Sequence, residues 1–195
     1  KYMENVISYE VENVRVRYSA ENNAVAYATG IDARISGEFI EGAESWFSLG
    51  ILSTKADIEG DGTGYVRRPS DQRVNVGIYF QDHIPNDPSI RMYLSLLYGS
   101  GLPFGPPDND RFRNAFTGRS YKRVDIGFSK IFDFTEKKIG NKVKSIWISL
   151  EVLNLLANNN VLSYTWVKTV NNQQFAVPNG LSARFLNLKI IGKFR

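Results

Sequence analysis

Apolar and polar side chains alternate at every second position in many stretches of this sequence, and no other feature limits the fold as strongly. Between Ile31 and Phe39 the odd positions are apolar or small, and every even position is charged or polar. A β-strand points successive side chains to opposite faces, so this period of two indicates strands that separate an apolar environment from a polar one. The stretches with this pattern are 14–18, 31–39, 46–53, 73–81, 91–98, 123–129, 145–152, 161–168 and 186–191. The sequence therefore predicts an all-β chain with about nine antiparallel strands.

Turn-forming residues gather between these stretches, and no stretch shows a comparable helical period. Gly and Asn tolerate a positive φ, and Pro presets a turn dihedral, so clusters of these residues predict connections. The clusters are 21–23, 59–64, 84–88, 101–107, 157–160 and 171–174. Strands joined in this way form a meander, in which each strand pairs with the next one along the chain.

Composition excludes several classes of protein. Although 43% of the residues are hydrophobic, no apolar run reaches the roughly 18 to 20 residues that a membrane-spanning helix needs. The chain has no cysteine, which rules out disulfides and thiolate metal sites. Its net charge of +4 comes from Lys and Arg residues scattered among 20 acids, so we expect no nucleic-acid partner. The opening residues 1–5 lack a signal-peptide pattern, and we expect an internal or processed start.

Strand length and the polar face favour a transmembrane barrel. Several strands are predicted to reach ten residues or more, about the length that crosses a bilayer at a tilt. The polar positions are rich in small and ionic residues, as in the interior of a large barrel, and aromatics near strand ends fit interfacial girdles. A soluble sandwich or lipocalin-like barrel with its apolar face turned inward is the alternative. Because single-chain bacterial barrels close with an even number of strands, about nine strands indicate part of a larger barrel.

Local motifs add a family resemblance. The stretch 121–128 (YKRVDIGF), the later stretch 150–156 (LEVLNLL) and the polar turn 158–160 resemble the C-terminal signature of TonB-dependent receptors. The closing stretch 186–194 resembles the terminal strand of that family. Further segments resemble receptors that carry a carboxypeptidase-regulatory-like N-terminal domain: 23–32, 67–73 and 98–107. Two departures are that the closing aromatic, Phe194, is penultimate and that Leu156 stands where many relatives have Phe.

The resemblance implies a role in nutrient uptake. It implies that residues 1–195 form the C-terminal part of a barrel of about 22 strands around a plug, and the plug and the TonB box lie outside this chain. Such a receptor resides in the outer membrane of a Gram-negative bacterium and takes up a scarce nutrient such as a siderophore, cofactor, glycan or peptide. The implied partners are the TonB energy-coupling complex, outer-membrane lipid, a surface lipoprotein, and the barrel assembly machinery, which would read Phe194. A self-contained small barrel acting as a passive pore or adhesin remains open, and so does a barrel hydrolase.

Charged residues on the polar positions are the candidate ligand contacts. They could touch a plug or a passing substrate, or pair with one another across adjacent strands. The basic candidates are Arg15, Arg17, Arg34, Arg91 and Arg123, and the acidic ones are Asp32, Glu38, Asp125 and Glu151.

We expect neither an enzyme nor a cofactor. His83 is the one histidine, and no Gly-x-Ser-x-Gly elbow accompanies it. The acidic loop 57–62 lacks the ligand spacing of a calcium loop, and 99–101 lacks the Lys of a phosphate loop. If Phe194 ends on the periplasmic side, strand alternation would put the Asn158 turn in the periplasm and the loop 170–179 outside.

Overall fold

The computed structural model describes residues 1–12, 15–41, 43–84, 87–107, 109–134, 143–181 and 183–194. The chain is all-β, and the described residues form strands in antiparallel sheets together with one 3-10 helix, η1 (Asp110–Phe112). In this part of the chain no helix is long and apolar enough to span a membrane.

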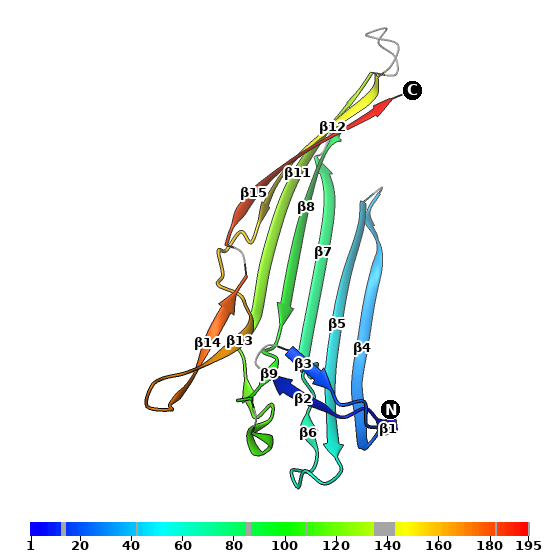
Figure 1. Cartoon of the computed structure of the whole chain (residues 1–195). Helices are drawn as coiled ribbons and strands as arrows, with labels where there is room; N and C mark the ends of the chain where they lie inside the picture. Colours follow the sequence, from blue (N-terminus) through cyan, green and yellow to red (C-terminus); the bar gives the residue numbers. More distant parts are fainter. Residues whose placement is uncertain are drawn as a thin grey trace.

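One nine-stranded antiparallel sheet makes up most of the molecule (Figure 1). Its strands pair in the order β1-β4-β5-β7-β8-β11-β12-β15, and β6 adds to β5. Their bounds are β1 Tyr2–Val6, β4 Ala24–Ile40, β5 Ala43–Ile58, β6 Val66–Arg67, β7 Val74–Ile84, β8 Asp87–Gly99, β11 Tyr121–Asp133, β12 Val143–Leu153 and β15 Phe185–Phe194. Among the described pairings, none joins β15 to β1 or β4, so the sheet is open here.

The register of the strands sorts side chains onto two different faces. On one face Ile31 lies beside Ile51, and Phe128 lies beside Leu150. This face is apolar along the long strands and is formed by Ile31, Ile35, Phe47, Leu49, Ile51, Val74, Val76, Ile78, Phe80, Met92, Leu94, Leu96, Val124, Ile126, Phe128, Ile146, Ile148, Leu150, Val152, Leu186, Leu188 and Ile190. The opposite face carries charged, hydroxyl and aromatic side chains. Alternation along each strand produces a sheet with one apolar and one polar face, because the pairing register places the apolar side chains of neighbouring strands on the same side.

Nothing in the described part of the chain covers the apolar face. Ile31 keeps 67% of its surface exposed, Leu150 50% and Leu188 64%. The fully buried apolar side chains are small or lie near the ends of strands, as Ala24, Ala43 and Tyr9 do. A soluble sandwich would bury this face, and the structure does not.

Three small hairpins stand apart from the main sheet. They pair β2 (Tyr9–Glu12) with β3 (Arg15–Tyr18), β9 (Pro103–Phe104) with β10 (Phe116–Thr117), and β13 (Val161–Lys168) with β14 (Gln174–Gly180). All three gather near the end of the sheet where the N-terminus lies, while the C-terminus lies at the opposite end (Figure 1). We call the end with the hairpins the looped end.

The two ends of the sheet differ in the length of their connections. Away from the looped end, the strands are joined across 41–42, 85–86 and 134–142. At the looped end the connections are 59–73, 100–120 and 154–184. The long connections therefore all lie on one side.

The strand predictions are confirmed locally and are wrong about two partners. Each of the nine predicted stretches contains a strand, but 15–18 and 161–168 pair only within their own hairpins and not with the main sheet. Alternation reports a local conformation and says nothing about the partner. β12 pairs directly with β15, so Asn158 and the loop 170–179 belong to one connection. The expectation that these two segments lie on opposite sides of a membrane is wrong.

Candidate functional site

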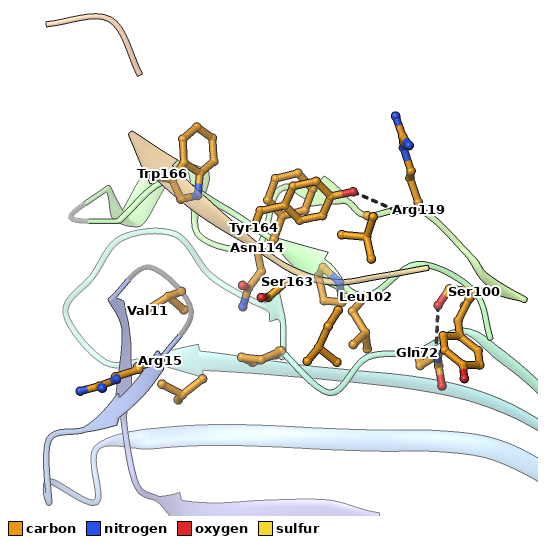
Figure 2. A pocket seen from close by; sticks show the side chains of 18 residues that line it. Val11, Arg15, Gln72, Ser100, Leu102, Asn114, Arg119, Ser163, Tyr164 and Trp166 are labelled. Atoms are coloured by element: carbon orange, nitrogen blue, oxygen red, sulfur yellow. Dashed lines mark hydrogen bonds between the residues drawn. The ribbon is translucent and has the colours of Figure 1, made fainter. Parts of the chain in front are cut away.

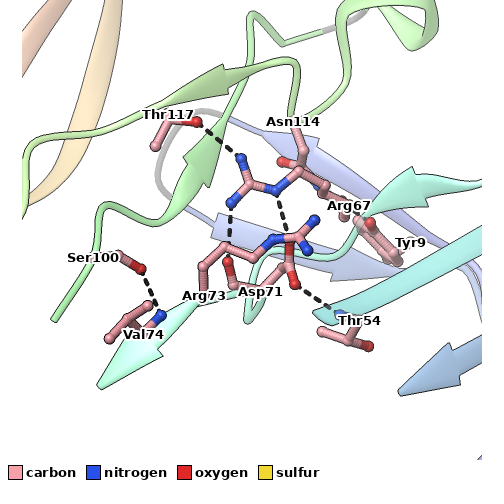
Figure 3. A network of polar contacts seen from close by, with 9 residues as sticks. All are labelled: Tyr9, Thr54, Arg67, Asp71, Arg73, Val74, Ser100, Asn114 and Thr117. Carbon is pink, nitrogen blue, oxygen red and sulfur yellow. Dashed lines mark hydrogen bonds and ion pairs between the residues drawn. The ribbon is translucent and has the colours of Figure 1, made fainter. Parts of the chain in front are cut away.

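A buried carboxylate ties the connection 59–73 to the end of β5 (Figure 3). The Asp71 side chain is fully buried. It accepts a hydrogen bond from the backbone N–H of Thr54 at 2.7 Å and one from Arg67 Nε at 2.6 Å. Arg73 Nε lies 3.0 Å from the same carboxylate. Two cations and a backbone donor thus satisfy the buried charge, which would otherwise be costly.

Two neighbouring residues bind the N-terminal hairpin to this network. Asn114 Nδ2 donates to the Tyr9 hydroxyl at 3.2 Å and to the carbonyl oxygen of Arg67 at 2.8 Å. The Arg113 guanidinium lies 5.8 Å from the centre of the Tyr9 ring. Burial raises the pKa of Tyr9, and the positive charge of Arg113 opposes that rise. The hairpin β2–β3 and the connections 59–73 and 100–120 are therefore held as one unit, which we call the cap.

An ion pair closes the cap on its other side. Arg113 NH2 lies 2.6 Å from Asp61 Oδ2, and the two side chains are 6% and 9% exposed. Asp61 also accepts from the backbone N–H and the hydroxyl of Thr63, at 2.9 and 2.8 Å. Burial alone would raise the pKa of Asp61, but these hydrogen bonds and Arg113 outweigh it and lower the pKa. These contacts thus favour the charged form of the carboxylate.

A cavity of about 350 Å³ lies between the cap and β13 (Figure 2). Its walls are mainly apolar and aromatic, and the Phe104 and Tyr164 rings stack with centroids 4.1 Å apart. The side chains of Arg15 and Arg119 extend away from it (Figure 2). Its volume lies at the lower end of the range of small-molecule pockets.

The predicted lumen-facing residues separate into different environments. Arg34 lies over the Trp46 ring at 5.6 Å on the polar face of the main sheet. Arg123 pairs with Asp125 on its own strand at 2.8 Å. Arg15 and Arg17 lie on β3, outside the main sheet, so the structure does not place them on its polar face. Asp32, Glu38, Arg91 and Glu151 do lie on that face.

The two sequence motifs that carry the family resemblance meet in one clasp. Asp125 Oδ1 accepts the backbone N–H of Asn154 at 2.8 Å, and Asn154 is 4% exposed. Asn160 Oδ1 accepts the backbone N–H of Lys122, and its amide donates back to the Lys122 carbonyl oxygen, at 2.8 and 2.9 Å. Asn158 Nδ2 donates to the same carbonyl at 3.1 Å. The chain leaving β12 thus folds back and binds the start of β11.

The remaining candidates show no assembled chemistry. The backbone N–H of His83 donates to Asp82 Oδ1, but its imidazole has no hydrogen-bond partner among the described residues. Within the same residues, no three His, Asp or Glu side chains are placed to hold a metal ion. Phe194, the predicted assembly signal, ends β15 beside Val143 and is 68% exposed.

Sequence reasoning missed the central residues of the cap. Asp71, Arg113 and Asn114 lie in irregular segments whose contacts come from distant parts of the chain, so no local period marks them. A clue existed in Asp71, an acid between two arginines in a turn-rich stretch, although such acids usually remain in solvent.

A scan against protein-family models, a search of curated proteins and a search of solved structures each returned no match.

Proposed function

We propose that this chain is a wall segment of an outer-membrane β-barrel receptor that takes up a scarce nutrient. The observation that carries the proposal is the apolar face, which is continuous across the long strands and uncovered, while the opposite face is polar. In a barrel wall the apolar face meets lipid and the polar face meets the lumen. Leaving so large an apolar face in water would be unusual for a soluble protein.

Strand length and connections agree with this arrangement. The long strands of the main sheet run from 10 residues in β15 to 17 in β4, against the roughly 9 to 11 that a tilted transmembrane strand needs. Barrels of this class have short periplasmic turns and long extracellular loops. The looped end then lies outside the cell, and the C-terminus lies on the periplasmic side.

The open edges favour a barrel larger than this sheet. β15 has no partner along its outer edge, and β4 has β1 only near its start, within the described pairings. Each unpaired backbone N–H or C=O group in lipid costs roughly several kcal/mol, so both edges of the sheet require further strands in a membrane. Residues 1–195 would then supply one part of the barrel, and the resemblance implies that this is the C-terminal part.

The receptor part of the proposal rests on the resemblance of 121–128, 150–160 and 186–194 to TonB-dependent receptors. The clasp between Asp125 and Asn154 gives the two internal motifs a shared structural role. A plug and a TonB box in another part of the protein would provide the energy coupling.

Single cysteines test the membrane arrangement, since the chain has no native cysteine. In outer-membrane preparations of the natural full-length protein, Leu150→Cys and Leu188→Cys should react with a maleimide dissolved in the bilayer. The matched variants Ser149→Cys and Lys189→Cys should react with a charged, water-soluble maleimide instead. Recovery of the protein in the aqueous fraction without detergent would refute the proposal.

Cross-linking in cells tests the receptor assignment. The full-length protein is expected to cross-link to TonB and to show little steady conductance in planar bilayers. A large constant conductance without cross-linking would instead support the passive pore.

A further inference from the structure

The polar face contains a recess built from small residues between larger ones. Ser129 on β11 lies beside Ser149 on β12 in the register of the main sheet. Arg91 on β8 flanks Ser129, and Lys189 on β15 flanks Ser149. The four strands are adjacent in the main sheet (Figure 1). Their register therefore gives one row with two hydroxyls in the middle and a cation at each side. The resulting hollow has a volume of about 460 Å³.

Aromatic rings close the recess along the direction of the strands. Tyr93 lies two residues beyond Arg91, and its ring covers Gly127, where an added Cβ would come within 2.2 Å of a ring carbon. Tyr79 stacks with Tyr93, their centroids 5.8 Å apart. Trp147 lines the hollow two residues from Ser149 on the other side. Aromatic rings pair with one another in stacked or edge-to-face arrangements, so these side chains favour a second ring system as a contact.

The charges in the recess favour an anion. Neither Arg91 nor Lys189 has an ion-pair or side-chain hydrogen-bond partner in the part of the chain that the structure describes. Glu151 also lines the hollow, but its carboxylate already accepts a hydrogen bond from Asn187 at 2.9 Å. Two cations against one carboxylate leave a net positive recess. The Ser149 and Ser129 hydroxyls lie between the two cations, and that of Ser129 also lies 3.5 Å from the carbonyl oxygen of Arg91.

We propose that this recess binds a planar ring compound carrying an acidic group. The ring contacts Tyr93 and Trp147, and the acidic group is held by Arg91 and Lys189 with help from Ser129 and Ser149. The inference rests on the proposed function in one respect, because the polar face must face the lumen of the barrel and not the lipid. It adds a ligand class and a place for it on the barrel wall, between the two ends of the strands.

Three small probes separate the two parts of this recognition. Benzoate has the ring and the charge, benzamide has the ring alone, and acetate has the charge alone. Ligand-observed NMR on the natural full-length protein in detergent should show benzoate binding at least about tenfold more tightly than either of the others. Equal affinity for benzoate and benzamide would overturn the proposal without any substitution.

Substitutions then locate the binding. The double variant R91Q/K189Q should weaken benzoate affinity by roughly tenfold, since Arg91 is partly exposed and Lys189 is exposed, and each contributes modestly. Ser149→Leu fills the floor of the recess and should abolish binding while the sheet remains folded. Lys193→Gln is the matched control, because it removes the same charge from the same strand outside the recess, and it should leave the affinity unchanged.

The outcomes of the two sets of experiments are distinguishable. Unchanged benzoate affinity in R91Q/K189Q, with bilayer labelling of Leu150→Cys intact, would refute the recess and leave the proposed function standing. Loss of that labelling would refute the proposed function itself.

Discussion

Replacing Asp71 by Asn should open the cap while leaving the main sheet intact. The substitution keeps the shape of the side chain but removes the negative charge that Arg67 and Arg73 share. The new amide NH2 group replaces one carboxylate oxygen, so one acceptor in the network is lost. Removing one partner of a buried ion pair costs about 3 to 5 kcal/mol. Here the arginine side chains are 21% and 43% exposed, so water compensates part of the loss, and we expect about 2 to 4 kcal/mol.

Hydrogen exchange measures this cost locally. The backbone N–H of Arg68 donates to the carbonyl oxygen of Thr54 at 3.1 Å, so it exchanges when the connection detaches from β5. Because about 1.4 kcal/mol is a factor of ten, exchange at Arg68 should accelerate roughly 30- to 700-fold in Asp71→Asn. Glu59→Gln is the control, since it removes an exposed charge from the same connection. Equal exchange rates in the two variants would show that the Asp71 network does not hold the cap.

Three further predictions concern the cap, the polar face and the clasp. The pKa of Asp61 is lowered in the folded protein. Its contribution to stability is therefore present above the usual carboxyl pKa of about 4 and is lost as the pH falls below that value. Relative to the intrinsic rate, amide hydrogen exchange in the cap should rise in that acid window in the natural protein and not in Asp61→Asn. Gly127→Ala should lower the thermal unfolding midpoint in detergent, because the added methyl displaces the Tyr93 ring at a cost of about 1 to 3 kcal/mol, whereas Gly37→Ala, with nothing within 4 Å of its added Cβ, should have little effect. Asn154→Ala should destabilise the protein by about 1 to 3 kcal/mol in urea titration, because it loses two side-chain hydrogen bonds at a residue with φ of 54°; an unchanged midpoint would contradict a stabilising clasp.

The polar-face residues were predictable in part. Alternation alone assigned Arg34, Arg91 and Arg123 to the polar side of their strands, and the register agrees. It could not indicate that Arg123 is paired with Asp125 while Arg91 is unpaired among the described residues. That difference depends on which side chains neighbouring strands bring within reach, and a shift of one residue in register would change it.

The cap and the recess depend on contacts between distant segments. Tyr9 meets Asn114 across more than half the chain, and the row from Arg91 to Lys189 needs four strands in one register. Such contacts arise because backbone pairing fixes the register between strands, and the register decides which side chains become neighbours.

The sequence by itself determined the strands and their two faces, because the period of two follows from backbone geometry that each strand adopts on its own. Only the tertiary structure decided which strands pair. β3 and β13 have the same alternation as the strands of the main sheet, yet each pairs within its own hairpin, because alternation does not specify which edge a strand pairs with. Tertiary structure likewise decides that β15 pairs with β12 alone among the described strands.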